Sequence, residues 1–239
     1  MKKHLIWLLP IIFLIIFAPF TPYLDLMVSE YFYSPERGFY NNRFFQILFL
    51  YGELFGLALG AFAFLLFIGS FLHPHWKKWR QGAFTILATL VLGAGILTNV
   101  LLKGYWGRPR PKQIEQFGGH QAYRPFWKPD LGNHQDPQRS FPSGHVAMGF
   151  YFISIYLLGI RMKNRLLTLF GLILAIGLGS SLMVTRVVQG GHFLSDVVVS
   201  PILMWLAALG VDKFTWGKWG EKILFLTNQK TMASTNDPF

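Results

Sequence analysis

Long apolar runs alternate with short polar segments along the chain, and this pattern predicts a membrane protein. A helix needs about 20 predominantly apolar residues to cross the hydrocarbon core of a bilayer. We identify six such runs, at residues 5–20, 46–72, 82–102, 142–160, 166–184 and 193–211. They predict an all-α fold, an integral membrane bundle of six transmembrane helices that forms a single domain over residues 1–239.

The first run, 5–20, follows Met-Lys-Lys-His, a start that also occurs in signal peptides. No small-x-small cleavage site follows, because the run passes into Ala-Pro-Phe-Thr-Pro. We therefore expect an uncleaved first span. The segment 31–45 then holds seven aromatic residues among polar ones, which predicts an aromatic belt at the headgroup level. A role of this segment in admitting a lipid stays open.

Composition supports the membrane assignment and excludes several chemistries. The chain is 52% hydrophobic and only 14% charged, against about 25% charged in an average soluble domain. It has no cysteine, which excludes a disulfide framework, a thiol nucleophile and a thiolate metal site. The net charge of +11 fits nucleic acid or anionic lipid. Because the basic residues lie between apolar spans, we expect contact with the lipid bilayer and no nucleic-acid partner.

Lys and Arg in the short loops predict the orientation of the helices. Twelve lie on the side of the two termini: Lys2, Lys3, Lys77, Lys78, Arg80, Arg161, Lys163, Arg165, Lys213, Lys218, Lys222 and Lys230. The other side has Arg37, Arg43, Arg186 and the cations of the loop 103–141. We therefore expect a multi-pass membrane protein with cytoplasmic termini and with this loop on the opposite, outer side of the membrane.

The loop 103–141 runs against that charge rule. Its seven basic residues are Lys103, Arg108, Arg110, Lys112, Arg124, Lys128 and Arg139. Its acidic residues are Glu115, Asp130 and Asp136. A solvated loop would explain Lys112 or Lys128 alone, but the cluster as a whole predicts an anion-binding surface.

Three polar stretches at the outer ends of spans can converge. The first is Lys103-Gly-Tyr-Trp-Gly-Arg-Pro-Arg-Pro111. Lysine supplies a mobile point charge, and the planar forks of Arg108 and Arg110 match phosphate oxygens. The prolines at 109 and 111 end the helix and stiffen the segment. Taken alone, such a cation is more often an interfacial anchor.

The second stretch, Pro142-Ser143-Gly144-His145, opens the fourth predicted span. Proline suits the first turn of a helix, and the amides of Ser143 and Gly144 are expected to be free for an anion. Gly144 lets an oxyanion approach the backbone, and His145 is placed to give or take a proton.

The third stretch runs from Thr185 to Asp196 and includes Arg186, Gly190, Gly191 and His192. If a helix begins near Gly191, His192 and Asp196 lie one turn apart on one face, and the carboxylate can fix the imidazole tautomer.

Glu53 is a further polar residue, inside the second span. Such a residue is more often paired with a hydroxyl or a histidine than catalytic, and the sequence assigns it no role.

In this order, Lys103-x6-Arg110-Pro111, Pro142-Ser143-Gly144-His145 and Arg186-x5-His192-x3-Asp196 resemble the three-part signature of the type 2 phosphatidic acid phosphatase superfamily. The resemblance covers the chain from the end of the third span to the sixth. It implies the same six-span topology with both termini inside. The family usually has serine at the position of Thr185. Threonine retains the hydroxyl of serine and adds a methyl group that alters the packing.

The resemblance implies a role for each matching residue. His192 would attack phosphorus and form a phosphohistidine, with Asp196 orienting it, and His145 would protonate the leaving oxygen and then activate water. The developing phosphoryl charge would be stabilised by Lys103, Arg110, Ser143, Gly144 and Arg186. Arg108 and Thr185 are candidate substrate contacts. No metal and no cofactor is expected.

The expected activity is a metal-independent lipid phosphate phosphatase. The sequence around Trp106 and around Gln189 resembles bacterial lipid A phosphatases, which implies a location in the bacterial inner membrane with the active site facing the periplasm. Phosphatidylglycerol phosphate and undecaprenyl diphosphate are handled by similar proteins. A lipid phosphotransferase would use the same residues.

The related vanadate-binding haloperoxidases are mainly soluble, which argues against that activity. An anion transporter would place charges within the spans and show paired halves; here the charges gather at the outer ends and no repeat is visible. The oligomeric state is left open.

Overall fold

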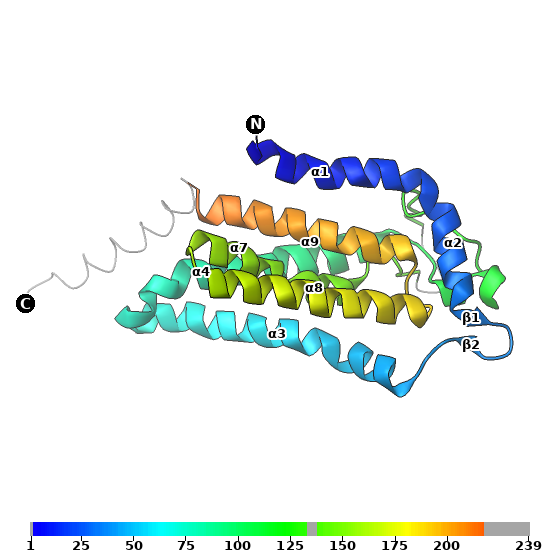
Figure 1. Cartoon of the computed structure of the whole chain (residues 1–239), viewed down its shortest axis with the longest axis horizontal. Coiled ribbons are helices and arrows are strands. Elements are labelled where there is room, and N and C mark those ends of the chain that lie inside the picture. The colour runs from blue at the N-terminus through cyan, green and yellow to red at the C-terminus, as the bar shows by residue number, and fades with distance from the viewer. Residues whose placement is uncertain (1, 133–137, 218–239) are drawn as a thin grey trace, which may run out of the picture.

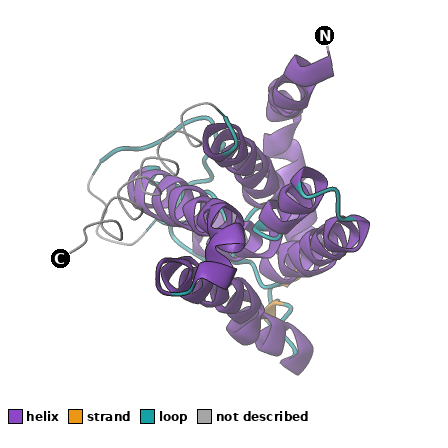
Figure 2. Cartoon of the chain, turned by 90° about the vertical axis from the view of Figure 1, so that its left-hand side faces the viewer, coloured by secondary structure: helices purple, strands orange, loops and turns teal. Residues whose placement is uncertain are grey.

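The computed structural model describes residues 2–132 and 138–217, which form a bundle of long helices (Figures 1 and 2). Six helical stretches are long and apolar enough to cross a membrane: His4–Tyr31, Arg43–Leu72, Pro74–Tyr105, Gly144–Arg161, Arg165–Val188 and Leu194–Thr215. The predicted all-α architecture with six spans is confirmed.

The first stretch is longer than predicted. It consists of α1 (Lys2–Phe17), the short η1 (Ala18–Phe20) and α2 (Thr21–Tyr31), so it continues for the 11 residues of α2 beyond the predicted end. Prolines stand within the first two positions of η1 and α2, where a missing amide costs no helical hydrogen bond. The chain therefore bends at these prolines and remains helical, and α2 is angled away from α1 (Figure 1).

A small antiparallel hairpin joins α2 to the second stretch. Its strands are β1 (Tyr33–Ser34) and β2 (Gly38–Phe39), and α3 (Arg43–Leu72) follows. Asn42 caps α3, because its side chain accepts a hydrogen bond from the Phe45 amide. The hairpin lies at one end of the bundle, beside the end of α2 (Figure 1).

The third stretch consists of four consecutive segments: η2 (Pro74–Trp79), α4 (Arg80–Thr89), the π-helical η3 (Leu90–Leu102) and α5 (Lys103–Tyr105). Lys103 thus begins the last helical turn of the stretch. The loop beyond it holds two short turns, η4 (Pro111–Gln113) and η5 (Glu115–Phe117).

The remaining helices are α6 (Gly144–Phe150), α7 (Ile153–Arg161), α8 (Arg165–Val188) and α9 (Leu194–Thr215). Tyr151 and Met204 are fully buried in the centre of the bundle. Glycines bring α3 close to its neighbours. A Cβ atom on Gly52 would lie 2.5 Å from Leu182 of α8, and one on Gly56 would lie 2.7 Å from Met148 of α6.

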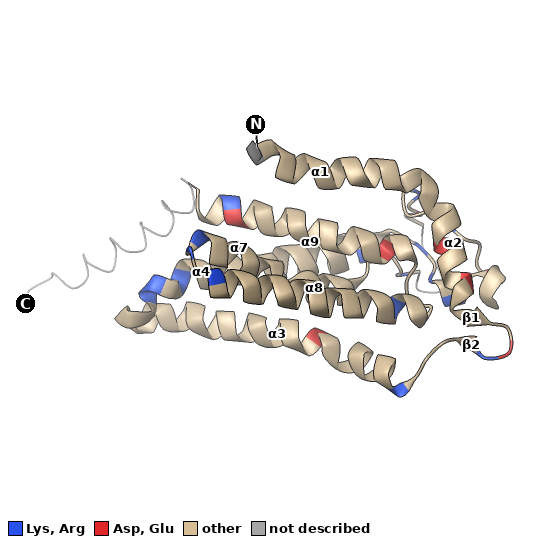
Figure 3. Cartoon of the chain, in the orientation of Figure 1, with Lys and Arg blue, Asp and Glu red and all other residues tan. Residues whose placement is uncertain are grey.

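The basic residues of the short connections, among them Lys77, Lys78, Arg161 and Lys213, gather at the end of the bundle opposite the hairpin (Figure 3). This is the separation of charge that the sequence predicted. The predicted tail cations Lys218, Lys222 and Lys230, and the loop acid Asp136, lie outside the described residues.

Candidate functional site

The loop between α8 and α9 fixes His192 against Arg186. The amides of Gly191 and His192 both donate to the carbonyl of Arg186, at 3.0 and 3.1 Å. Gly190 has φ +59°, which favours glycine, and a Cβ on Gly191 would lie 2.2 Å from Arg186 Nη2. The pair of glycines therefore lets the guanidinium pass directly over the turn, and His192 is only 1% exposed.

Asp196 reaches His192 by a route that differs from the predicted one. The helix α9 begins at Leu194, so His192 lies before it and the two residues do not share a helical face. Asp196 stands in the first turn and accepts the Phe193 amide at 2.9 Å, which turns its carboxylate back toward the loop. Asp196 Oδ2 lies 3.6 Å from His192 Nδ1, which is longer than a direct hydrogen bond.

The surroundings of His192 keep its imidazole neutral. Burial lowers the pKa of His192 to about 3; the Asp196 carboxylate opposes this shift and the charge of Arg186 adds to it. A neutral imidazole has one ring nitrogen with a free lone pair. His192 is therefore in the protonation state that a nucleophile requires at neutral pH.

Arg108 has a different place from the one predicted. It is fully buried, and its guanidinium donates to the Arg124 carbonyl at 2.8 Å, to Ser195 Oγ at 2.8 Å, to Asp25 at 2.7 Å and to Asp196. Burial alone would lower the pKa of Arg108, but the two carboxylates outweigh it and raise the pKa. The structure thus places all three nitrogens of Arg108 in contacts inside the protein, so the role that they support is structural.

Asp25 of α2 completes this buried network, and sequence reasoning missed it. It is fully buried, accepts the Ser195 amide at 2.8 Å and accepts the Tyr123 hydroxyl at 2.9 Å. Arg108 therefore bridges two carboxylates, one from the first span and one from the last. The signal that could have revealed Asp25 was an acidic residue only five positions beyond the predicted end of the first span.

Three cations converge beside His192. Lys103, Arg110 and Arg186 come from different segments, yet each lies within electrostatic range of the other two. Gly144, at the start of α6, lies beside this cluster: a Cβ there would be in van der Waals contact with Lys103 Nζ, at 3.4 Å, and would clash with Asn99 Oδ1, at 2.8 Å. Burial lowers the pKa of Arg110, so its charge is poorly compensated by solvent. The cluster is suited to a bound anion.

The second stretch is placed as expected, but with one amide occupied. Ser143 precedes α6 as its N-cap, and its amide donates to Ser200 Oγ at 2.9 Å. The prediction of a free Ser143 amide is therefore wrong.

Thr185 of α8 is buried, and its hydroxyl donates to the Ser181 carbonyl at 2.7 Å within the helix. The structure thus gives the Thr185 hydroxyl a partner within its own helix, and its contact with a substrate stays a prediction.

Four buried side-chain atoms at the centre of the site have no hydrogen-bond partner among the described residues: Arg110 Nε, Ser143 Oγ, Arg186 Nε and His192 Nδ1. Buried polar groups are normally paired, because an unsatisfied one costs about 1–3 kcal/mol. Three of the four belong to the residues that the sequence assigned to phosphate binding. A polyoxygen anion would satisfy those three groups, whereas His192 Nδ1 faces Asp196.

His145 has a partner that the sequence did not assign. Its Nδ1 lies 2.9 Å from Glu53 Oε1, and its ring stacks on Phe49 of α3 with centroids 4.7 Å apart. The Arg186 guanidinium lies on the same Phe49 ring, 4.6 Å from its centroid. The second span thus contributes directly to the site.

The predicted anion-binding surface includes fewer cations than the seven of the loop 103–141. Arg108 belongs to the buried network, and Arg124 pairs with Asp130 at 2.6 Å and donates to the Gly107 carbonyl at 2.9 Å. The loop therefore divides into cations that hold the fold and cations that face the site.

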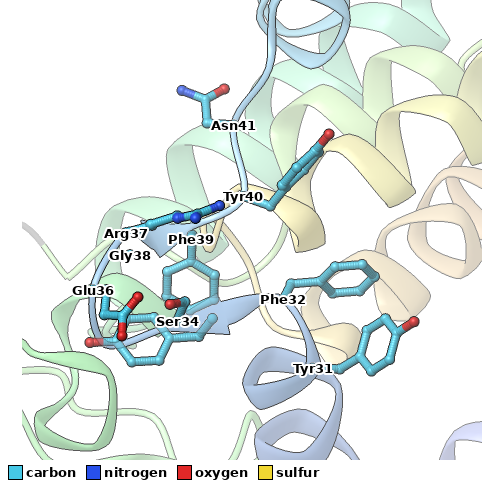
Figure 4. A pocket seen from close by; sticks show the side chains of 10 residues that line it. Tyr31, Phe32, Ser34, Glu36, Arg37, Gly38, Phe39, Tyr40 and Asn41 are labelled. Carbon is cyan, nitrogen blue, oxygen red and sulfur yellow. The ribbon is translucent and has the colours of Figure 1, made fainter.

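A pocket of about 720 Å³ lies in the hairpin next to the site. Figure 4 shows its aromatic side chains, including Phe39 and Tyr40, together with Arg37 and Asn41. Asn41 accepts a hydrogen bond from Gln189 at 3.0 Å, and Gln189 accepts one from Arg186 at 3.0 Å. The pocket is therefore joined to the cation cluster by two hydrogen bonds.

The fold and the site together define a membrane protein with two histidines and three cations at one end of a six-span bundle. Residues 83–219 match the family model of the PAP2 superfamily, and the chain belongs to that superfamily. The resemblance found in the sequence is thereby confirmed. The chain is a phosphoric ester hydrolase of the lipid phosphatase class.

Curated relatives of the chain carry one common name. The "Lipid A 4'-phosphatase" of Francisella tularensis subsp. novicida (strain U112) is 30% identical over 197 residues, which cover 80% of this chain and 86% of the relative. The protein of the same name from Rhizobium leguminosarum is 34% identical over 125 residues, 52% of this chain and 49% of the relative. No solved structure is significantly similar to the chain.

Proposed function

We propose that the chain removes a phosphate from lipid A by way of a phosphohistidine on His192. The unpartnered buried donors beside His192 are the observation that carries this proposal, because they fit the oxygens of a phosphoryl group. The shared name of the curated relatives supports lipid A as the substrate.

In the first step, Nε2 of His192 attacks phosphorus, since Nδ1 faces Asp196. The bond from phosphorus to the lipid oxygen breaks, and His145 gives its proton to that oxygen. Lys103, Arg110 and Arg186 stabilise the charge on the phosphoryl oxygens, aided by the Ser143 hydroxyl and the open backbone at Gly144. Asp196 orients the ring of His192.

In the second step, water attacks the phosphohistidine. His145, now neutral, accepts a proton from the water as the new P–O bond forms and the P–N bond breaks. Free phosphate and neutral His192 result, and His145 is again protonated. The proposed roles therefore close a cycle that needs no metal.

A panel of purified lipids tests the proposal. Purified protein in detergent should release phosphate from lipid A with chelator present, and more slowly from phosphatidylglycerol phosphate, phosphatidic acid and undecaprenyl diphosphate. Preference for one of the other lipids would refute the lipid A assignment, and loss of turnover in chelator would refute the metal-free cycle. Transfer of phosphate to an added second lipid would identify the phosphotransferase instead, and anion flux without hydrolysis would favour a transporter.

We also propose that the site faces the periplasm, with both termini in the cytoplasm. The separation of charges supports this orientation, because Lys and Arg of short loops are retained inside. The chain has no cysteine, so single cysteines can report sidedness. In intact cells with a permeabilised outer membrane, an impermeant maleimide should label Glu36→Cys in the hairpin and spare Lys77→Cys until the cells are lysed. The opposite pattern would reverse the orientation.

A further inference from the structure

We infer that Glu53 is a positioning residue for His145, so that the site contains a second carboxylate–histidine pair beside Asp196 and His192. The inference rests on the proposed function and extends it to the second span. Its basis is the 2.9 Å contact between Glu53 Oε1 and His145 Nδ1, made between α3 and the start of α6.

Glu53 is the single acidic residue in the 30 residues of α3. A carboxylate inside a membrane span costs free energy and is normally found paired or at a functional site. Two glycines lie near it in α3: Gly52 is in close contact with α8, and Gly56 is in close contact with α6. The glycine contacts hold α3 near α6 and bring the carboxylate within hydrogen-bond distance of the imidazole.

The same helix also fixes the plane of the His145 ring. Phe49, one turn before Glu53, stacks on the imidazole with an angle of 16° between the planes. Stacking restricts the tilt of the ring, and the hydrogen bond to Glu53 restricts its rotation. His145 is therefore held by two side chains of one rigid helix.

This arrangement determines which nitrogen of His145 can act. With Nδ1–H donating to Glu53, Nε2 is the atom left to give a proton to the leaving oxygen and to take one from water. His145 must also carry positive charge in a site crowded with cations. Lys103 and Arg186 both lie within electrostatic range of Glu53, whose negative charge compensates the imidazolium. Glu53 thus does for His145 what Asp196 does for His192.

A structural role for the pair makes different predictions from a positioning role. If Glu53 only satisfied a polar group in the span, its loss would lower stability and would disturb all substrates alike. If it positions the proton donor, its loss should lower kcat with little change in KM. The deficit should also depend on whether the leaving group needs a proton.

The experiment compares Glu53→Gln, which keeps the shape but removes the charge, with Glu53→Asp, which keeps the charge. The exposed Glu30 of α2 provides the matched control Glu30→Gln. With lipid A, Glu53→Gln should lose about 10- to 100-fold in kcat, less than the roughly 10²- to 10⁴-fold that complete acid–base catalysis supplies. KM should change less than about 3-fold, Glu53→Asp should recover part of kcat, and Glu30→Gln should match the parent.

Para-nitrophenyl phosphate provides the second measurement, because nitrophenolate leaves without being protonated. In single turnovers, Glu53→Gln should form the phosphoenzyme from this ester at close to the parent rate. Parent-like kcat with lipid A, a change confined to KM, or equal losses of phosphoenzyme formation from both substrates would overturn the inference.

These outcomes are separable from failure of the proposed function. If His192→Ala still hydrolyses lipid A, the proposed mechanism fails, whatever Glu53 does. If His192→Ala and His145→Ala are inactive while Glu53→Gln is normal, only the role of Glu53 is wrong.

Discussion

Replacing His192 by alanine should abolish phosphate release from lipid A while leaving the protein folded. The substitution removes the proposed attacking nitrogen, and losing the nucleophile of a catalytic unit costs on the order of 10⁶-fold in turnover. The cation cluster would remain, so binding of inorganic phosphate should persist. Steady-state phosphate release in detergent measures the first effect, and competition by phosphate in a binding assay measures the second.

The matched control is His75→Ala, since His75 is exposed in η2 at the opposite end of the bundle. It should retain parent turnover. In a rapid quench, His145→Ala should accumulate an acid-labile phosphoenzyme whenever its first step still proceeds, and His192→Ala should form none. Undiminished turnover by His192→Ala would refute the proposed nucleophile.

Replacing Arg108 by leucine should produce the largest loss of stability. Its guanidinium bridges Asp25 and Asp196, and both carboxylates are fully buried. Removing one partner of a buried ion pair leaves an uncompensated charge and costs about 3–5 kcal/mol. Thermal unfolding in detergent should therefore begin at a clearly lower temperature than in the parent.

Arg161→Leu is the control for this substitution. Arg161 pairs with Asp212 at 2.6 Å, and its own side chain is 43% exposed, so solvent can reach the site that it leaves. Because the Asp212 side chain is only 10% exposed, Arg161→Leu should still lower stability, but by less than Arg108→Leu, which leaves two fully buried carboxylates. Adding Asp25→Asn to Arg108→Leu should recover part of the stability, because one unpaired charge is removed. An Arg108→Leu protein as stable as Arg161→Leu would show that the network is not needed for folding.

Much of the site could be predicted from the sequence because its residues fall in short, ordered motifs. Lys103, Arg110, Ser143, His145, Arg186 and His192 stand at the ends of apolar runs, and helices of similar length place such ends together. The structure brings these residues to one end of the bundle. The local spacing also predicted the pair of His192 and Asp196, although the helix begins later than expected.

The partners of the buried charged residues were not predictable in the same way. Arg108 and Arg110 belong to one motif and carry the same side chain, yet one is buried between two carboxylates and the other faces the site. Asp25 and Glu53 are single acids in apolar surroundings, and nothing in the neighbouring residues indicates their partners. Asp25 contacts Arg108, Tyr123 and Ser195, of which the nearest in the sequence, Arg108, is 83 positions away.

The sequence by itself determined the number of spans and the residues that we propose for the chemistry, because apolar length and motif spacing are local properties. Only the tertiary structure decided which polar groups meet. The rotation and height of each helix depend on close contacts such as those of Gly52 and Gly56, made with residues far along the chain. Those contacts set Glu53 against His145 and Asp25 against Arg108, so the pairing of buried charges is a property of the packed bundle.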